Sequence, residues 1–228
     1  MKYIVIGLGV YGRTVAQDLA ALGHDVIAVD SDASLVDHIK DRVATTFVLD
    51  STDEEQLALL PLKDIDTVIV AIGENFGASI RTIALLKKKG VRHLYARAMD
   101  EIQKSILEAF ELDKILSPEE ESARNLVREM DFGGSVNVYP VDKDHFVFTI
   151  QVPSVLVGRQ FRVLNLYEKY QLKPITLRRV EEHRNMLGIR IREARVVEVS
   201  DSMMLAAGDE IVCYGTYENY QKFCKEQK

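Results

Sequence analysis

Three glycines near the start of the chain have the spacing of a phosphate-binding turn. Gly7, Gly9 and Gly12 form a GxGxxG pattern between the apolar run "YIVI" and the amphipathic run "GRTVAQDLAALG". In such a turn the first glycine permits a tight bend, the second lets a pyrophosphate approach the backbone, and the third lets helix and strand pack closely. The helix N-terminus then offers unpaired N–H groups to an anion. The pattern predicts a dinucleotide-binding loop, and a purely structural glycine turn is the alternative.

A carboxylate follows these glycines at the distance that a ribose contact requires. Asp30 ends the next apolar run, "DVIAVD", eighteen residues after Gly12. A carboxylate at this position accepts hydrogen bonds from the ribose hydroxyls. Ser31 and Asp32 follow it, where an arginine would be needed to neutralise a 2′-phosphate. We therefore expect a ligand of the NAD type and not NADP.

A second polar group ends the third apolar run, "TTFVL". Asp50, Ser51 and Thr52 come directly after it, and ligands of open parallel sheets bind at the carboxyl ends of the strands. These residues are therefore candidate ligand contacts. The alternative is a helix cap formed by Ser51 or Thr52, with Glu55 three residues after Thr52. Both roles are compatible because they use different atoms.

Two later runs bring further polar groups to the same edge. The fourth run, "TVIVAIGENFGAS", brings Gly73 and the side chains of Glu74 and Asn75, which are either contacts or helix caps. Arg97 ends the fifth run, in "HLYARA", and could place a cation near a phosphate. A solvated charge at a strand end is the alternative for Arg97.

These residues meet only if their strands all run in the same direction. Six apolar runs between residue 2 and about residue 130 alternate with amphipathic stretches such as "ASIRTIALLKKKG". Runs rich in Val and Ile, without polar alternation, indicate strands that are covered on both faces. The predicted fold class is therefore α/β, a Rossmann-like doubly wound parallel sheet.

The pattern changes after the segment "REMDFGGSVNVYP". We place a domain boundary there, so that residues 1–133 form the nucleotide-binding domain and residues 134–228 a second domain. Alternating strands such as "HFVFTIQVP" and "DEIVCYGT", the short helix "VLNLYEKYQ" and a closing amphipathic helix follow. They predict a small α+β C-terminal domain.

Composition excludes several classes of protein. Residues 1–133 hold 15 Lys/Arg and 23 Asp/Glu, and the rest of the chain holds 14 and 12. An acidic first domain argues against nucleic acid, which requires clustered cations. No apolar run reaches the ~18 residues of a membrane span, and we expect no signal peptide. Cys213 and Cys224 lack a CxxC spacing and suit a reducing cytoplasm as free thiols.

Together these motifs resemble a known family. "YIVIGLGVYGRTVAQDLAALGHDVIAVD", "VLDSTDEEQL", "TVIVAIGENFGASI", "HLYARA" and "DKILSPEEESA" resemble, in order and spacing, the N-terminal regulator-of-potassium-conductance (RCK) domain of TrkA/KtrA-type potassium uptake proteins. The second domain resembles their C-terminal module through "VLVGRQFRVLNLYEKYQLKPITL" and "MMLAAGDEIVCYGT". The resemblance covers essentially the whole chain.

The resemblance implies a role for each matching residue. By this resemblance, the phosphate loop consists of Gly7, Leu8, Gly9, Val10 and Tyr11, and the ribose acceptor is Asp30. Ser51 and Thr52 flank the adenine. Gly73 and Glu74 line the phosphate side, and Arg97 contributes positive charge. Glu119 matches a carboxylate that helps to bind a divalent cation in some relatives. An ordinary acidic first helical turn, Glu119 to Glu121, is the alternative.

The resemblance also implies a regulatory function. Such proteins bind NAD, NADH, ADP or ATP, form homodimers that assemble into a ring, an octamer or a tetramer, and gate a membrane potassium-translocating subunit of the TrkH/KtrB type. The expected location is cytoplasmic, peripheral at the inner face of the membrane. Similar C-terminal modules in some relatives bind cyclic di-AMP. The run "RRVEEHR", residues 178–184, offers charge for such a ligand, and a solvated strand end and turn is the alternative. Val10 stands where many relatives have an arginine, so we expect no strong preference for a third phosphate.

Two other functions fit parts of this pattern. A small NAD-dependent dehydrogenase of the siroheme/precorrin type also begins with a short glycine-rich domain, but it needs an acid or base beside the nicotinamide. None of the five histidines is expected at the carboxyl edge with a carboxylate partner: His24, His38, His93, His145 and His183. The other is an adaptor that senses nucleotide without a channel partner. We expect a regulatory protein that is not an enzyme.

Overall fold

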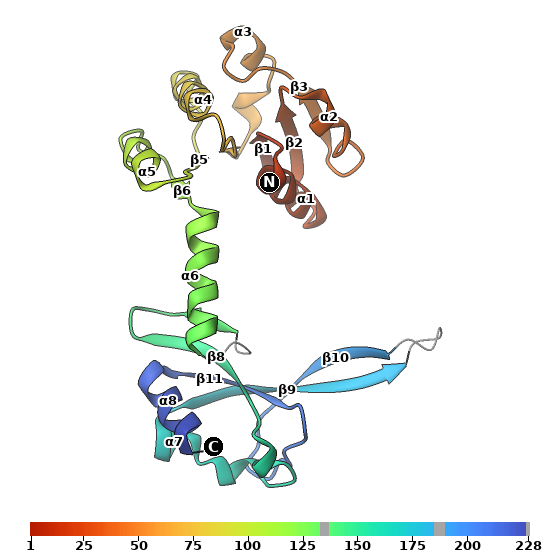
Figure 1. Cartoon of the computed structure of the whole chain (residues 1–228). Coiled ribbons are helices and arrows are strands. Elements are labelled where there is room, and N and C mark those ends of the chain that lie inside the picture. The colour runs from red at the N-terminus through yellow and green to blue at the C-terminus, as the bar shows by residue number, and fades with distance from the viewer. Residues whose placement is uncertain (133–136, 185–189, 227–228) are drawn as a thin grey trace. The chain divides into compact units, whose positions relative to one another are not determined.

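The computed structural model describes residues 1–132, 137–184 and 190–226. The chain separates into two compact units, Met1–Glu121 and Ser122–Lys228, which are called unit 1 and unit 2 below. Figure 1 labels most of the elements of each unit. The predicted boundary at residues 133 and 134 lies outside the described residues and stays a prediction.

Unit 1 is built on a six-stranded sheet in which every pair of neighbouring strands is parallel. The strand order is β3-β2-β1-β4-β5-β6, the order of a Rossmann fold. The strands are β1 (Lys2–Ile6), β2 (Asp25–Asp30), β3 (Thr45–Val48), β4 (Thr67–Val70), β5 (Leu94–Arg97) and β6 (Lys114–Leu116). Each strand coincides with one of the six predicted apolar runs to within one residue at its start, so the predicted fold class is confirmed.

Helices cover both faces of this sheet (Figure 1). They are α1 (Val10–Ala21), α2 (Ala33–Asp37), α3 (Glu54–Leu57), α4 (Phe76–Lys88) and α5 (Glu101–Glu108), with a 3₁₀ turn at Leu62–Asp64. Ile4 and Ile6 belong to one core cluster, with apolar residues of α3, α4 and α5. Val5 belongs to the other, with residues of α1 and α2. Successive side chains of β1 therefore serve opposite faces, as a buried parallel strand requires.

Local sequence fixes where several helices begin and end. Gly23 and Gly90 follow α1 and α4 with φ of +85° and +74°, the left-handed conformation expected of glycines after a helix. Asn75 caps α4 because its side-chain oxygen accepts the N–H of Ala78 at 3.0 Å. Because α4 begins shortly after β4 ends, its capped start lies close to the carboxyl ends of the strands, where the candidate site is predicted.

Unit 2 contains a five-stranded antiparallel sheet of order β10-β9-β11-β8-β7. Its strands are β7 (Val138–Pro140), β8 (His145–Gln151), β9 (Lys173–Arg184), β10 (Arg190–Val197) and β11 (Glu210–Thr216). The helices are α6 (Pro118–Asp131), which begins in unit 1, and α7 (Leu166–Tyr170) and α8 (Tyr217–Glu226), with 3₁₀ turns at Ser154–Leu156 and Phe161–Leu164. The predicted α+β class is therefore confirmed.

One predicted helix of unit 2 is interrupted. The run at residues 163–171 begins in the 3₁₀ turn Phe161–Leu164, and α7 starts only after Asn165, whose φ is +43°. The left-handed conformation of Asn165 breaks the helical path, because a left-handed residue cannot continue a right-handed helix. Residues of the turn and of α7, Leu164 and Leu166 among them, still reach the same core cluster.

Within the described residues, no helix combines the length and apolar character needed to cross a bilayer. Cys213 and Cys224 are both free thiols. Cys213 is buried in β11, and burial raises the pKa of its thiol to about 12.

Candidate functional site

The glycine loop has the tight geometry of a strand-to-helix turn. Gly7 has φ of +93°, and a Cβ atom there would lie 2.9 Å from the backbone nitrogen of Ile72. A Cβ atom on Gly12 would lie 1.8 Å from the carbonyl oxygen of Gly7. Any larger residue at either position would collide with backbone. These two glycines therefore bring α1 against the end of β1.

The N-terminus of α1 is open to solvent. Gly9 is the residue before the helix, and a Cβ atom on it would meet no described atom within 4 Å. No side chain among the described residues caps this helix end. Val10, its first residue, is 77% exposed, whereas Leu8 is fully buried and belongs to the core cluster on the α1 face of the sheet. The first N–H groups of α1 and the positive end of its dipole are therefore available to an anion.

Asp30 lies beside this loop and is hydrogen-bonded to it. Its Oδ2 accepts the backbone N–H of Leu8 at 2.6 Å, and its Oδ1 accepts that of Asp32 at 2.9 Å. Each carboxylate oxygen has two lone pairs, so both oxygens can still accept a ribose hydroxyl. Ser31 is exposed next to it. Asp32 caps α2, and its hydrogen bonds to Ser34 lower the pKa of its carboxyl group.

The group after β3 is organised differently from the prediction. Asp50 Oδ1 accepts both the backbone N–H and the hydroxyl of Thr52, at 2.9 and 2.7 Å. Ser51 is only 6% exposed, and its hydroxyl is hydrogen-bonded to that of Thr82 in α4 at 2.8 Å. The predicted cap by Ser51 or Thr52 is wrong: Asp53 caps α3 by accepting the N–H groups of residues 55 and 56. Asp53 has the same short carboxylate as Asp50, but it is the residue directly before α3, from which its side chain reaches those N–H groups.

Arg97 brings the remaining predicted residues together. A Cβ atom on Gly73 would lie 3.0 Å from Nη1 of Arg97 and 3.0 Å from Sδ of Met99. The Arg97 guanidinium lies over the ring of Tyr11, 5.3 Å from its centroid, and donates to Glu119. Arg97, Tyr11, Gly73 and Glu119 therefore form one cluster, while Glu74 is exposed beside it.

Burial and the neighbouring charges of this cluster shift the pKa of the Tyr11 phenol. Burial is the main cause that raises the pKa of the Tyr11 phenol, and the negative charges of Glu121 and Glu119 raise it further. The cation of Arg97 opposes them. Tyr11 thus stays neutral at physiological pH and offers Arg97 the face of an uncharged ring.

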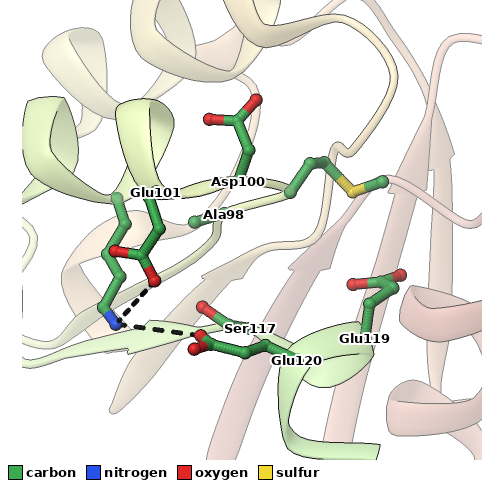
Figure 2. A pocket seen from close by; sticks show the side chains of 8 residues that line it. Ala98, Asp100, Glu101, Ser117, Glu119 and Glu120 are labelled. Carbon is green, nitrogen blue, oxygen red and sulfur yellow. Dashed lines mark ion pairs between the residues drawn. The ribbon is translucent and has the colours of Figure 1, made fainter. Parts of the chain in front are cut away.

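A cavity of ≈ 480 Å³ lies between β5, β6 and the starts of α5 and α6. Figure 2 shows Asp100 and Glu101 on one side of it and Glu119 and Glu120 on the other. Lys104 is paired at 3.8 Å with each of Glu101 and Glu120. The remaining lining residues are Ala98, Met99 and Ser117. Its lining carries four carboxylates and one lysine, so its net negative charge disfavours a phosphate.

The predicted metal role of Glu119 has no support from its neighbours. Across the described parts of the chain, no group of three or more His, Cys, Asp and Glu residues is placed to hold a metal ion. The carboxylate of Glu119 pairs with Arg97. The metal role therefore stays a prediction.

The described histidines lie away from this edge or serve turns. His93 precedes β5, at the amino end of the sheet, and pairs with Asp113 at 2.8 Å. His145 pairs with Asp142 in a turn, His38 contacts the carbonyl of Ser34, and His24 packs against Tyr3. The side chain of His183 lies outside the described residues, as do most side chains of the charged run at 178–184.

Two residues that organise the edge were missed by sequence reasoning. Arg81 donates from Nε to the carbonyl of Thr52 at 2.8 Å, and Thr82 holds Ser51. Both residues come from α4, so this helix fixes the loop after β3. The available signal was weak: a hydroxyl on the apolar face of a helix requires a partner, but the sequence does not say which.

Two comparisons with known proteins identify a family. Residues 3–118 match the TrkA-N domain family. The chain is 30% identical to the Ktr system potassium uptake protein C of Bacillus subtilis (strain 168) over 181 residues, 79% of this chain and 82% of that protein.

Solved structures share the fold at low sequence identity. The crystal structure of the GsuK RCK domain aligns with a TM-score of 0.53 and 18% identity, over 99% of this chain and 46% of that one. The GsuK channel bound to NAD aligns with a TM-score of 0.59 and 12% identity, over 100% and 39%. A TrkA-N match over half of the chain and a close relative along most of its length lead to one conclusion: the chain belongs to the TrkA-N family of Ktr-type potassium uptake proteins.

Proposed function

We propose that this chain is the nucleotide-sensing regulatory subunit of a potassium uptake system. Its ligand is an adenine nucleotide, NAD(H), ADP or ATP, bound at the carboxyl edge of the six-stranded sheet. The observation that carries the proposal is the uncapped N-terminus of α1 beside Gly9, with Asp30 held next to it. Family membership and the NAD-bound GsuK channel of similar fold support it.

In this proposal each predicted group contacts one part of the ligand. The pyrophosphate lies over Gly9 and accepts the N–H groups of the first turn of α1. The ribose hydroxyls donate to Asp30, and the adenine lies toward Asp50 and Thr52. Ser51 contributes through the placement of its loop, because its hydroxyl is already bonded to α4.

On the other side of the pyrophosphate, Gly73 and Glu74 line the approach and Arg97 supplies a positive charge. Val10 offers no charge at the mouth of the site, so NAD(H), ADP and ATP bind without a strong preference for the third phosphate. A preference of more than ~100-fold for ATP over ADP, about 2.7 kcal/mol, would contradict this.

Regulation requires that the nucleotide favours one arrangement of an assembly over another. We propose that the chain forms homodimers within a ring, an octamer or a tetramer, at the cytoplasmic face of a TrkH/KtrB-type membrane subunit. Coupling of 1–3 kcal/mol per site is typical, so several sites together could supply the ~5.5 kcal/mol that moves a gate from mostly shut to mostly open. A divalent cation and cyclic di-AMP are further proposed ligands of such an assembly.

Asp30→Ala tests the nucleotide site, and Asp25→Ala is its matched control. Both residues belong to β2, but Asp25 begins the strand and Asp30 ends it. Isothermal titration calorimetry should show about 10- to 100-fold weaker NAD or ADP binding for Asp30→Ala, since two charge-assisted hydrogen bonds are lost. Asp25→Ala should bind normally. Equal affinities of Asp30→Ala and the wild type would refute the assigned site.

The regulatory role has its own test. A tagged copy of the chain should co-purify with a membrane potassium-translocating subunit, and the nucleotide should be recovered intact. Turnover of NAD in the presence of a tetrapyrrole precursor would instead favour the dehydrogenase. Nucleotide binding without a membrane partner would favour an adaptor.

A further inference from the structure

The guanidinium of Arg97 is incompletely satisfied. The side chain is only 14% exposed. Its Nε is buried and has no hydrogen-bond partner among the described residues. Gly73 and the ring of Tyr11 pack against it without accepting a conventional hydrogen bond from the guanidinium. A guanidinium has five N–H donors, so this one keeps donor capacity for an incoming anion.

Glu119 occupies one side of this guanidinium. Nη2 of Arg97 donates to Oε1 of Glu119, which lies in the first turn of α6. The two partners differ in freedom, because the side chain of Glu119 is 52% exposed and that of Arg97 is 14% exposed. Glu119 can therefore turn into water at little cost, whereas Arg97 is confined between Gly73 and Tyr11.

We propose that the Arg97–Glu119 pair is a latch that a nucleotide phosphate opens. The inference rests on the proposed function, because it needs a phosphate at this edge. A phosphate offers more acceptor oxygens than Glu119 supplies and can take two guanidinium N–H groups at once. It replaces Glu119 on Arg97, and the released carboxylate moves into solvent.

The latch links the ligand to α6. This helix begins at Pro118, and unit 2 begins at Ser122, within the same helix. Opening the latch changes the contacts of the first turn of α6 without any contact between that turn and the nucleotide base. The ligand-free and ligand-bound states then differ in a helix shared by both units, which is the differential contact that sensing requires.

The test compares Glu119→Gln with Glu120→Gln in the full chain, with ADP as the probe. The two residues are neighbours in one helical turn, but Glu120 pairs with Lys104 at 3.8 Å. Calorimetry in EDTA removes any contribution from a divalent cation. Glu119→Gln should bind ADP about fivefold tighter than the wild type, equivalent to ~1 kcal/mol, because its competitor is gone. Glu120→Gln should stay within about twofold of the wild type.

A double-mutant cycle separates competition from simple charge repulsion. Arg97→Gln should weaken ADP binding, and adding Glu119→Gln to it should change nothing further, since the latch is already absent. If Glu119→Gln tightens binding equally in both backgrounds, or in neither, the latch is refuted.

Hydrogen exchange gives a readout in α6 itself. The N–H of Glu121 donates to the carbonyl of Ser117 at 3.0 Å. ADP should speed exchange of this amide in the wild type and leave it unchanged in Glu119→Gln. Unchanged exchange in the wild type at saturating ADP would overturn the latch alone. A wild type that binds no ADP would overturn the proposed function as well.

Discussion

The two units differ in how completely the hydrogen-bonding groups of particular charged side chains are used. In unit 2, Asp209 is 1% exposed and accepts hydrogen bonds from Nε and Nη2 of Arg179, at 2.9 and 2.7 Å, and from the N–H of Ala206 at 2.8 Å. In unit 1, Asp30 and Arg97 keep unused hydrogen-bonding capacity, and the start of α1 has no side-chain cap in the described chain. Asp209 in unit 2 therefore stabilises packing, whereas Asp30, Arg97 and the start of α1 in unit 1 are available to a ligand.

Strand direction explains the contrast. In a parallel sheet all carboxyl ends, and the helix N-termini that follow them, collect at one edge. An antiparallel sheet has no such edge, because its strand ends alternate. Among the described residues of unit 2, Lys169 likewise pairs with Glu226.

The largest effect is expected at Gly12. Gly12→Ala places a Cβ atom 1.8 Å from the carbonyl oxygen of Gly7, so α1 must shift, at a cost of about 4 kcal/mol in the free energy of unfolding. Gly9→Ala meets no described atom within 4 Å and should change stability by less than ~1 kcal/mol. It should still weaken nucleotide binding at least ~10-fold, because the methyl group occupies the pyrophosphate position. Urea denaturation and calorimetry together check both variants; normal NAD binding by a folded Gly9→Ala would contradict the contrast.

A nearly equal effect on stability, with none on binding, is expected in unit 2. Asp209→Ala leaves the half-buried Arg179 without its carboxylate and should lower the free energy of unfolding by about 3 kcal/mol. Glu210→Ala is the control: it removes the more exposed pair with Arg178, at 3.2 Å, and should cost less than ~1 kcal/mol. Denaturation curves measure both. Nucleotide affinity should be unchanged, and a loss in Asp209→Ala would mean that the two units share one site.

The smallest effect is a pH dependence at a cap of unit 1. The backbone N–H groups of Gln56 and Glu55 hold the pKa of the Asp53 carboxyl below its usual range. A lowered pKa stabilises the fold above the unfolded value, and that contribution is lost as the pH falls through the folded value, below about pH 4. Asp53→Asn keeps an acceptor but does not titrate. Its melting temperature should therefore fall less than that of the wild type between pH 6 and pH 3; parallel curves would argue against the assignment.

The fold of unit 1 is largely readable from sequence. The run "DVIAVD" coincides with β2, and the glycine spacing identifies the turn after β1, because backbone sterics leave few alternatives there. In unit 2, β8 and β11 fall within the runs "HFVFTIQVP" and "DEIVCYGT". The helix predicted at residues 163–171 is interrupted by the left-handed conformation of Asn165, and the apolar periodicity gives no sign of that break.

The candidate site is readable only in outline. Four consecutive residues from Asp50 to Asp53 can each cap a helix, so the sequence does not single out Asp53. The bond between Ser51 and Thr82 joins residues 31 positions apart, as the Arg97–Glu119 pair joins residues 22 apart. Such contacts are set by tertiary packing and leave no periodic signal in the chain.

The bond between Asp30 and the N–H of Leu8 has a consequence for reading related sequences. This carboxylate accepts a hydrogen bond from the glycine loop itself, in addition to any contact with a ligand. Both oxygens of Asp30 accept backbone N–H groups. In Asp30→Asn the NH₂ group would face one of these N–H groups, and two donors cannot form a hydrogen bond with each other. An acidic residue here can therefore persist in a relative that has lost its nucleotide, so its presence alone is no record of what that relative binds.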